Sequence, residues 1–95
     1  MAKAMIGDLT IAESTSPVLL EGSFYFPPSS VRKDLLTVGD RQYTCPWKGK
    51  ATYWDINTGE SVLHNAAWSY EEPKDAAREI TGHVAFDKSS VSVSN

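Results

Sequence analysis

The sequence pattern that most restricts the fold is that of two strands joined by a tight turn. Residues 51–56 are rich in residues that favour strands, and residues 60–63 resume the pattern after the loop Asn57-Thr58-Gly59. A three-residue loop that ends in glycine is typical of a β-hairpin with a type I turn and a bulge. Pairing across this loop predicts that Trp54 faces Val62 and that Lys48 lies near Trp68, and a bulge would shift that register by one residue.

Short segments elsewhere in the chain predict further strands and one or two short helices. Strand patterns occupy residues 4–13, as one or two strands with a break at Gly7-Asp8, and residues 18–26, 41–45 and 83–86. The predicted helices cover residues 30–36, ending at Gly39-Asp40, and the segment after Pro73, because proline suits the first helical position. We therefore expect a mainly β fold, with α+β as the alternative, organised as a compact antiparallel sheet.

Length and composition indicate one soluble globular domain. A chain of 95 residues has room for a single core, and 41% hydrophobic with 22% charged residues is a composition typical of globular proteins. We expect one domain over residues 1–95, with its core at about 4–88. The serine-rich residues 89–95 are predicted to form a frayed tail.

Charge and cysteine content exclude several classes of partner. The net charge is −3 and the nine Lys and Arg residues are scattered, so nucleic acid is not an expected partner. No apolar stretch approaches the roughly 20 residues that span a bilayer, so no membrane association is expected either. Cys45 is the one cysteine, which rules out an internal disulfide. Without a signal-peptide pattern at the start, the chain is predicted to be cytoplasmic.

Several blocks of sequence at fixed spacing carry a family resemblance. They are Tyr25-Phe26-Pro27, Cys45-Pro46-Trp47-Lys48-Gly49-x-Ala51-x-Tyr53, Ala67-Trp68-x-Tyr70, Pro73 and Gly82-x-Val84-x-Phe86. From about residue 4 to residue 88 the chain resembles the domain of unknown function 427 family. That resemblance implies a small, mainly bacterial, cytoplasmic domain of uncharacterised activity, with a compact β structure of the Mss4-like or β-tent type.

The resemblance also bears on cofactors and activity. Relatives with the β-tent architecture often carry zinc on paired CxxC motifs, which this chain lacks, so neither a metal nor another cofactor is expected. The family sometimes carries a nucleotidyltransferase label. This sequence has neither a phosphate-binding glycine loop nor a close pair of carboxylates on one strand for Mg²⁺.

Three residues are candidates for catalysis. Cys45 could act as a nucleophile if Lys48 or His64 lowered the pKa of its thiol, because the thiolate is the reactive species. A single cysteine is, however, very often a small buried apolar residue. The catalytic alternative therefore rests on Cys45, Lys48 and His64 alone.

Aromatic residues around the predicted hairpin suggest a binding site. Tyrosine and tryptophan combine an apolar body with a polar tip, which suits recognition of a small ligand or peptide, although most bulky residues in a small β domain fill its core. The predicted ligand-binding residues are Tyr25, Trp47, Lys48, Tyr53, Trp68 and Tyr70. We expect a binding module with an aromatic cleft; an enzyme that uses Cys45 or has nucleotidyltransferase-like activity, and a homodimeric interaction protein, are the alternatives.

Overall fold

Nine strands and three short 3-10 turns make up the chain, so the predicted mainly β class is confirmed. The computed structural model describes all 95 residues. The strands form three antiparallel sheets, with two, three and four strands. The predicted helices are shorter than expected: η1 (Pro28–Ser30) and η2 (Lys33–Leu35) replace the first, and η3 (Asp75–Ile80) replaces the second.

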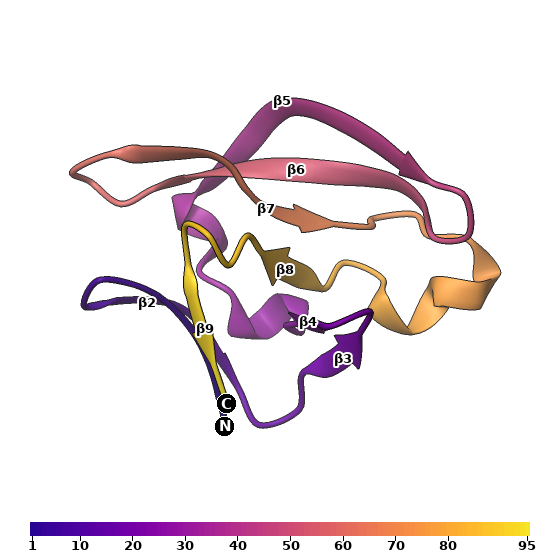
Figure 1. The fold of residues 1–95 in the computed structure, drawn as a ribbon, viewed down its shortest axis with the longest axis horizontal. Helices are drawn as coiled ribbons and strands as arrows, with labels where there is room; N and C mark the ends of the chain where they lie inside the picture. Colours follow the sequence, from indigo (N-terminus) through magenta and orange to yellow (C-terminus); the bar gives the residue numbers. More distant parts are fainter.

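The largest sheet has the strand order β5-β6-β7-β8. Its strands are β5 (Leu36–Cys45), β6 (Gly49–Asn57), β7 (Val62–Ser69) and β8 (Val84–Phe86). β5 forms one edge and arches over the top of the molecule in Figure 1. Beyond β8, Phe26 and Val84 exchange two backbone hydrogen bonds of 2.8 and 2.9 Å, which attach the smallest sheet to this one.

The three-stranded sheet joins the two ends of the chain. β1 (Ala2–Ile6) pairs with β2 (Leu9–Ser14) on one side and with β9 (Ser92–Ser94) on the other, so the termini lie side by side in Figure 1. The prediction of a frayed tail over residues 89–95 is therefore wrong. Val91 is buried in the core and β9 completes the sheet, which stabilises the end of the chain.

The segment predicted as one strand over residues 18–26 is a hairpin. β3 (Val18–Leu20) and β4 (Ser23–Tyr25) pair through a two-residue turn at Glu21 and Gly22. Both turn residues have positive φ, +53° and +79°, as a type I′ turn requires. The interruption places the Glu21 side chain at the tip of a turn.

The predicted hairpin exists, but its register differs from the prediction. The turn covers residues 58–61, Asn57 pairs with Val62, and Tyr53 pairs with Trp68. Between these pairs three residues of β7, 64–66, face the single residue Asp55 of β6. The turn itself shifts the pairing by three residues from the prediction, and this bulge, larger than the one-residue shift considered from the sequence, adds two more. Trp68 therefore faces Tyr53 and not Lys48.

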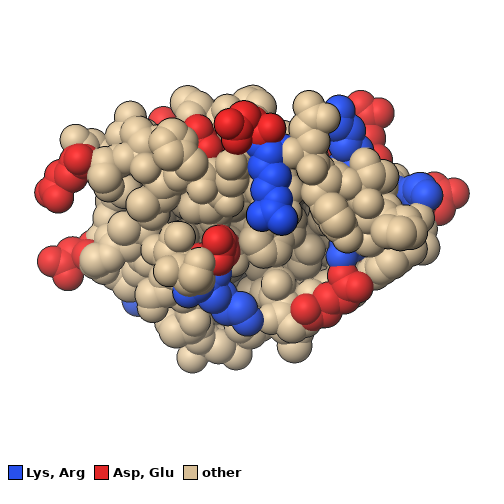
Figure 2. Space-filling model, turned by 45° about the horizontal axis from the view of Figure 1, so that its top comes forward, with Lys and Arg blue, Asp and Glu red and all other residues tan.

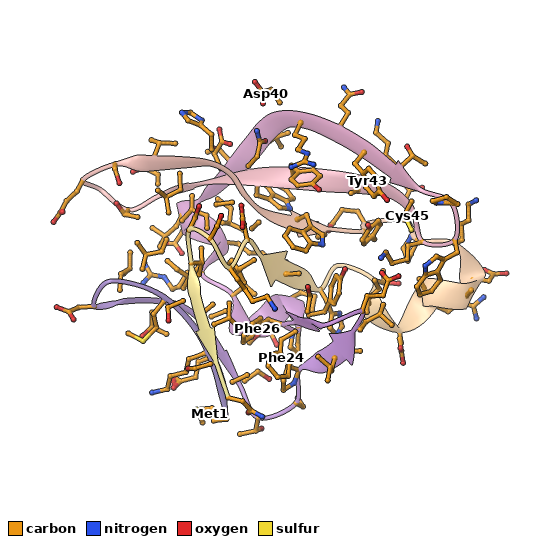
Figure 3. All side chains as sticks on the ribbon, in the orientation of Figure 1. Met1, Phe24, Phe26, Asp40, Tyr43 and Cys45 are labelled. Atoms are coloured by element: carbon orange, nitrogen blue, oxygen red, sulfur yellow. The ribbon has the colours of Figure 1, made fainter.

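A second bulge lies on the other side of β6. Residues 39–41 of β5 stand opposite Tyr53 alone, so Gly39-Asp40, predicted to end a helix, lies inside a strand. Asp40 marks the crest of the arch in Figure 3. The bulge and the charges of Asp40 and Arg41 interrupt the free edge of β5, as is common on edge strands that avoid pairing with other chains.

Two apolar clusters form the core, one against each face of the large sheet around β8. Along β8, Val84 and Phe86 enter the first cluster and Ala85 enters the second, as alternation along a strand requires. The first cluster includes residues of β1, β2 and β6 and the edge-to-face ring pair Phe26–Phe86. The second cluster lies between the sheet, the β3–β4 hairpin and η3; it comprises Tyr25, Cys45, Ala51, Tyr70, Ala77, Ile80 and Ala85.

Charged side chains of both signs are interspersed over the face drawn in Figure 2, without an extended region of one sign. No helix in the structure combines the length and the apolar character needed to cross a membrane.

Candidate functional site

The six predicted ligand-binding residues gather around the second apolar cluster. Tyr25 and Tyr70 belong to it, and Tyr53 and Trp68 pack against it. Lys48 lies in the turn between β5 and β6, with its ammonium close to the rings of Trp47 and Tyr70. The structure thus brings all six together from β4, the β5–β6 turn, β6 and the end of β7.

The turn between β5 and β6 is fixed by its glycine and by a lysine from outside it. Cys45 pairs with Gly49 across the turn, and Gly49 has a φ of +104°, which an L side chain rarely adopts. The backbone N–H of Lys74 donates to the carbonyl of Lys48 (2.9 Å), and Lys74 Nζ donates to the carbonyl of Pro46 (2.6 Å). These contacts turn the Lys48 side chain towards the core.

Lys48 is a buried cation with a single anionic partner. Its residue is 7% exposed, and its ammonium forms a salt bridge with Glu21. Lys48 Nζ lies 5.2 Å from the Trp47 ring centroid and 5.5 Å from that of Tyr70, distances at which cation–π attraction operates. Burial, the largest single effect, lowers the pKa of Lys48. The hydrogen bond to Glu21 and the Coulombic interactions with Tyr25, Cys45 and Glu21 together outweigh it, so the pKa of Lys48 is raised.

Glu21 reaches this cation from the tip of the β3–β4 turn. Its second carboxylate oxygen accepts a hydrogen bond of 3.3 Å from Trp47 Nε1, and its side chain remains about half exposed. The hydrogen bond from Lys48 holds the pKa of Glu21 below its ordinary value. Glu21, Trp47, Lys48 and Tyr70 are called the Lys48 site below.

A second set of contacts links the remaining predicted residues. Trp68 Nε1 donates to the Tyr25 hydroxyl (3.2 Å), and the Tyr53 and Trp68 rings lie 6.1 Å apart. The guanidinium of Arg41, brought over β6 by the β5 bulge, stands 4.9 Å from the Tyr53 ring centroid. Burial raises the pKa of the Tyr70 hydroxyl, and the nearby Tyr25 and Cys45 add to that effect, so Tyr70 is a neutral hydrogen-bonding group at physiological pH.

The aromatic residues form a packed cluster rather than the open cleft predicted from the sequence. Tyr25 and Tyr70 are 2% and 3% exposed, and none of the five main cavities is lined by any of the six residues. Trp47, at 38%, is the most exposed aromatic of the Lys48 site. The predicted residues adjoin one another, but access to Lys48 passes by Trp47 and Glu21.

The weaker catalytic candidates do not form one group. Cys45, at the end of β5 in Figure 3, is a buried thiol of the second cluster, close to Lys48. His64 lies apart, in the β7 bulge, with Nδ1 at 3.3 Å from Asp55 and a largely exposed ring. No three side chains of His, Cys, Asp or Glu lie close enough together to hold a metal ion.

Sequence reasoning missed a polar relay on the opposite face of the sheet. Trp54 Nε1 donates to Ser69 Oγ (2.9 Å), and Ser69 Oγ donates to Glu71 Oε2 (2.5 Å). Ser69 is fully buried, and these three residues line a cavity of about 90 Å³. The pattern Ser69-x-Glu71 on one strand face was the available signal, but the predicted register set Trp54 opposite Val62 and so separated Trp54 from Ser69.

A comparison with curated proteins finds no match. The family model described as a domain of unknown function (DUF427) matches residues 1–95, which is the whole chain. The blocks that carried the resemblance contribute both to the Lys48 site and to the core contacts that surround it. This chain therefore belongs to the DUF427 family.

Proposed function

We propose that this domain is a binding module for a small anionic ligand, which Lys48 holds. The observation that carries the proposal is a buried ammonium whose one anionic partner, Glu21, is half exposed at the tip of a two-residue turn. A buried cation needs a counter-charge, since desolvation without a partner is costly. An anion that displaced Glu21 would meet that need equally well.

The surroundings of Lys48 suit an anion with an apolar or aromatic body. The Trp47 ring flanks the ammonium on the exposed side and the Tyr70 ring on the buried side. Trp47 Nε1, which now donates to Glu21, supplies a second hydrogen-bond donor. Carboxylates and phosphates share the required chemistry, and a benzoate ring would add contact with Trp47.

Glu21 acts in this proposal as an internal competitor. An arriving ligand must exchange with a carboxylate that is already hydrogen-bonded to Lys48 and Trp47. Displaced Glu21 passes into water, where an exposed carboxylate is well solvated. Removing the charge of Glu21 should therefore strengthen ligand binding, whereas removing the charge of Lys48 should abolish it.

The test is a titration followed by NMR with acetate, benzoate and phosphate in turn. The indole N–H of Trp47 reports the site directly, because it contacts the carboxylate that is displaced. We expect its cross-peak to shift with benzoate, at a concentration roughly tenfold lower in Glu21→Gln than in the wild type. Lys48→Met should show no shift.

Lys50→Gln is the matched control because Lys50 follows the same turn but is exposed and forms no salt bridge. It should bind benzoate like the wild type. A Trp47 cross-peak that does not move with any of the three anions, even in Glu21→Gln, would contradict the proposal. A response to phosphate but not to benzoate would assign the site to phosphate esters and sulfates.

A further inference from the structure

Two opposite charges that form no salt bridge, both on exposed residues, border the cavity beside Glu71. Lys33 and Glu71 both line it, together with Leu36, Trp54, Ser69, Gly82 and Val84. Neither Lys33 nor Glu71 belongs to any salt bridge of the structure, although both border the same space. The cavity, defined by these seven residues, is called the Glu71 cavity.

The carboxylate of Glu71 is oriented by the relay behind it. The fully buried Ser69 hydroxyl donates to Oε2 and accepts from the Trp54 indole, so both polar groups of the relay are satisfied within the protein. Glu71 Oε1 accepts no hydrogen bond within the protein, and because Glu71 is an exposed residue this oxygen is accessible to a donor. A carboxylate held on one oxygen and open on the other is pre-organised to receive a cation.

The remaining walls set the size and polarity of a ligand. Leu36, Trp54 and Val84 are the apolar part of the lining, and the positive charge of Lys33 provides a partner for an anion. A volume of about 90 Å³ leaves room for only a few water-sized groups. A ligand that satisfies both charges in this space has to carry an ammonium and a carboxylate on a very small frame.

We propose that the Glu71 cavity is a second binding site, specific for the smallest zwitterionic amino acids. The ligand's ammonium donates to Glu71 Oε1 and packs against the Trp54 ring, and its carboxylate pairs with Lys33. This site lies on the opposite face of the sheet from the Lys48 site, since Trp54 and Ser69 alternate with Tyr53 and Trp68 along their strands. It is independent of the function proposed above.

The tryptophans allow the two sites to be observed separately in one experiment. Each indole N–H has a different acceptor: Glu21 for Trp47, Ser69 for Trp54 and Tyr25 for Trp68. The three indole cross-peaks are assigned by Trp47→Phe and Trp68→Phe, which leave the Trp54 peak by elimination. Only the Trp54 peak should report the Glu71 cavity.

The experiment is an NMR titration with glycine at constant ionic strength, repeated with acetate and with methylammonium. We expect glycine to shift the Trp54 peak with a dissociation constant of roughly millimolar order, because so small a ligand makes few contacts. Acetate and methylammonium each satisfy one charge and should shift that peak at least about tenfold more weakly. The Trp68 peak should not respond to glycine, and a Trp47 response would report the glycine carboxylate at the Lys48 site, separately from the Trp54 peak.

Two glutamate-to-glutamine variants test whether glycine binding depends on the cavity. Glu71→Gln keeps the size of the side chain and removes the charge, and it should weaken glycine binding about tenfold or more. Glu72→Gln is the control, because Glu72 neighbours Glu71 in sequence but does not line the cavity. The urea midpoint of each variant establishes that both remain folded.

Three outcomes would overturn the inference. The first is a Trp54 peak that stays in place up to about 100 mM glycine. The second is an equal response to glycine and to methylammonium, which would show that the cavity does not select a zwitterion. The third is equal weakening by Glu71→Gln and Glu72→Gln, which would place the effect outside the cavity.

Discussion

The side chain of Asn65 on β7 occupies the space that a Cβ at Gly39 on β5 would need, although β6 separates the two strands. The two bulges make this contact possible, because they lie on either side of β6 at neighbouring positions. Asn65 Oδ1 accepts from the backbone N–H of Arg41 (3.2 Å) and Nδ2 donates to Asp40 (2.9 Å). Asn65 of β7 thus forms hydrogen bonds with two residues of β5, across β6.

Gly39→Ala should destabilise the fold by about 1–3 kcal/mol, as is typical when a well-packed site is overfilled. The added methyl group would overlap Asn65 Oδ1 and lie 2.9 Å from Asp55 Oδ1, so the hydrogen bonds of Asn65 must move. Urea unfolding measures the effect as a lower midpoint at unchanged slope. The double variant Gly39→Ala/Asn65→Gly should be more stable than the sum of the single changes predicts. If Gly39→Ala unfolded at the wild-type urea midpoint, the predicted overlap with Asn65 would be refuted.

Replacing Glu21 should lower the stability of the fold more than replacing Lys48. Glu21→Gln leaves a buried ammonium without its counter-ion, whereas Lys48→Met leaves a carboxylate that water can solvate. We expect Lys48→Met to change stability by no more than about 1 kcal/mol. Glu21→Gln should have the lower urea midpoint of the two. The opposite order would mean that the cation–π contacts with Trp47 and Tyr70 alone support the ammonium.

The Lys48–Glu21 pair should also make the difference in unfolding free energy between the wild type and Glu21→Gln depend on pH. The folded-state pKa of Glu21 lies below its ordinary value of 4.5, so the stability from this group is present above pH 4.5 and is lost as pH falls through the lowered pKa. The difference in unfolding free energy should therefore shrink on acidification. Asp34 and Asp87, whose pKa values are also lowered, titrate in both proteins and cancel in the comparison. A difference that stays constant down to about pH 3 would rule out the pair as its source.

The parts of the fold that local sequence determines could be predicted. The break between β1 and β2 at Gly7-Asp8, the β6–β7 hairpin and the mainly β class each follow from turn residues and alternation within a few positions. The paired bulges could not be predicted, because they depend on Asn65 reaching across β6 to Gly39. β9 was missed for a similar reason: its serine-rich sequence carries no strand signal, and its order comes from pairing with β1.

The candidate site, like the fold, could be predicted from the sequence only in part. Motif positions were sufficient to group Trp47, Lys48 and Tyr70, since the β5–β6 turn and the end of β7 approach each other in any hairpin of this length. Glu21 was not recognised because residues 18–26 were predicted as one uninterrupted strand. In such a strand Glu21 would not lie in a turn beside Lys48. The relay through Ser69 required the true register of β6 and β7, which the turn over residues 58–61 and the bulge at Asp55 set together.

The thiol of Cys45 should react slowly in the native protein. It is 5% exposed within the second apolar cluster, and a disulfide-exchange reagent must reach the sulfur to react. We expect labelling by such a reagent to be limited by opening of the structure and to become fast in urea. Cys45→Ala should accordingly leave benzoate binding at the Lys48 site unchanged, because the thiol contributes packing and not a contact with the ligand. Native labelling as fast as that of the unfolded chain would instead support an accessible nucleophile beside Lys48, and would favour the catalytic alternative over the binding module.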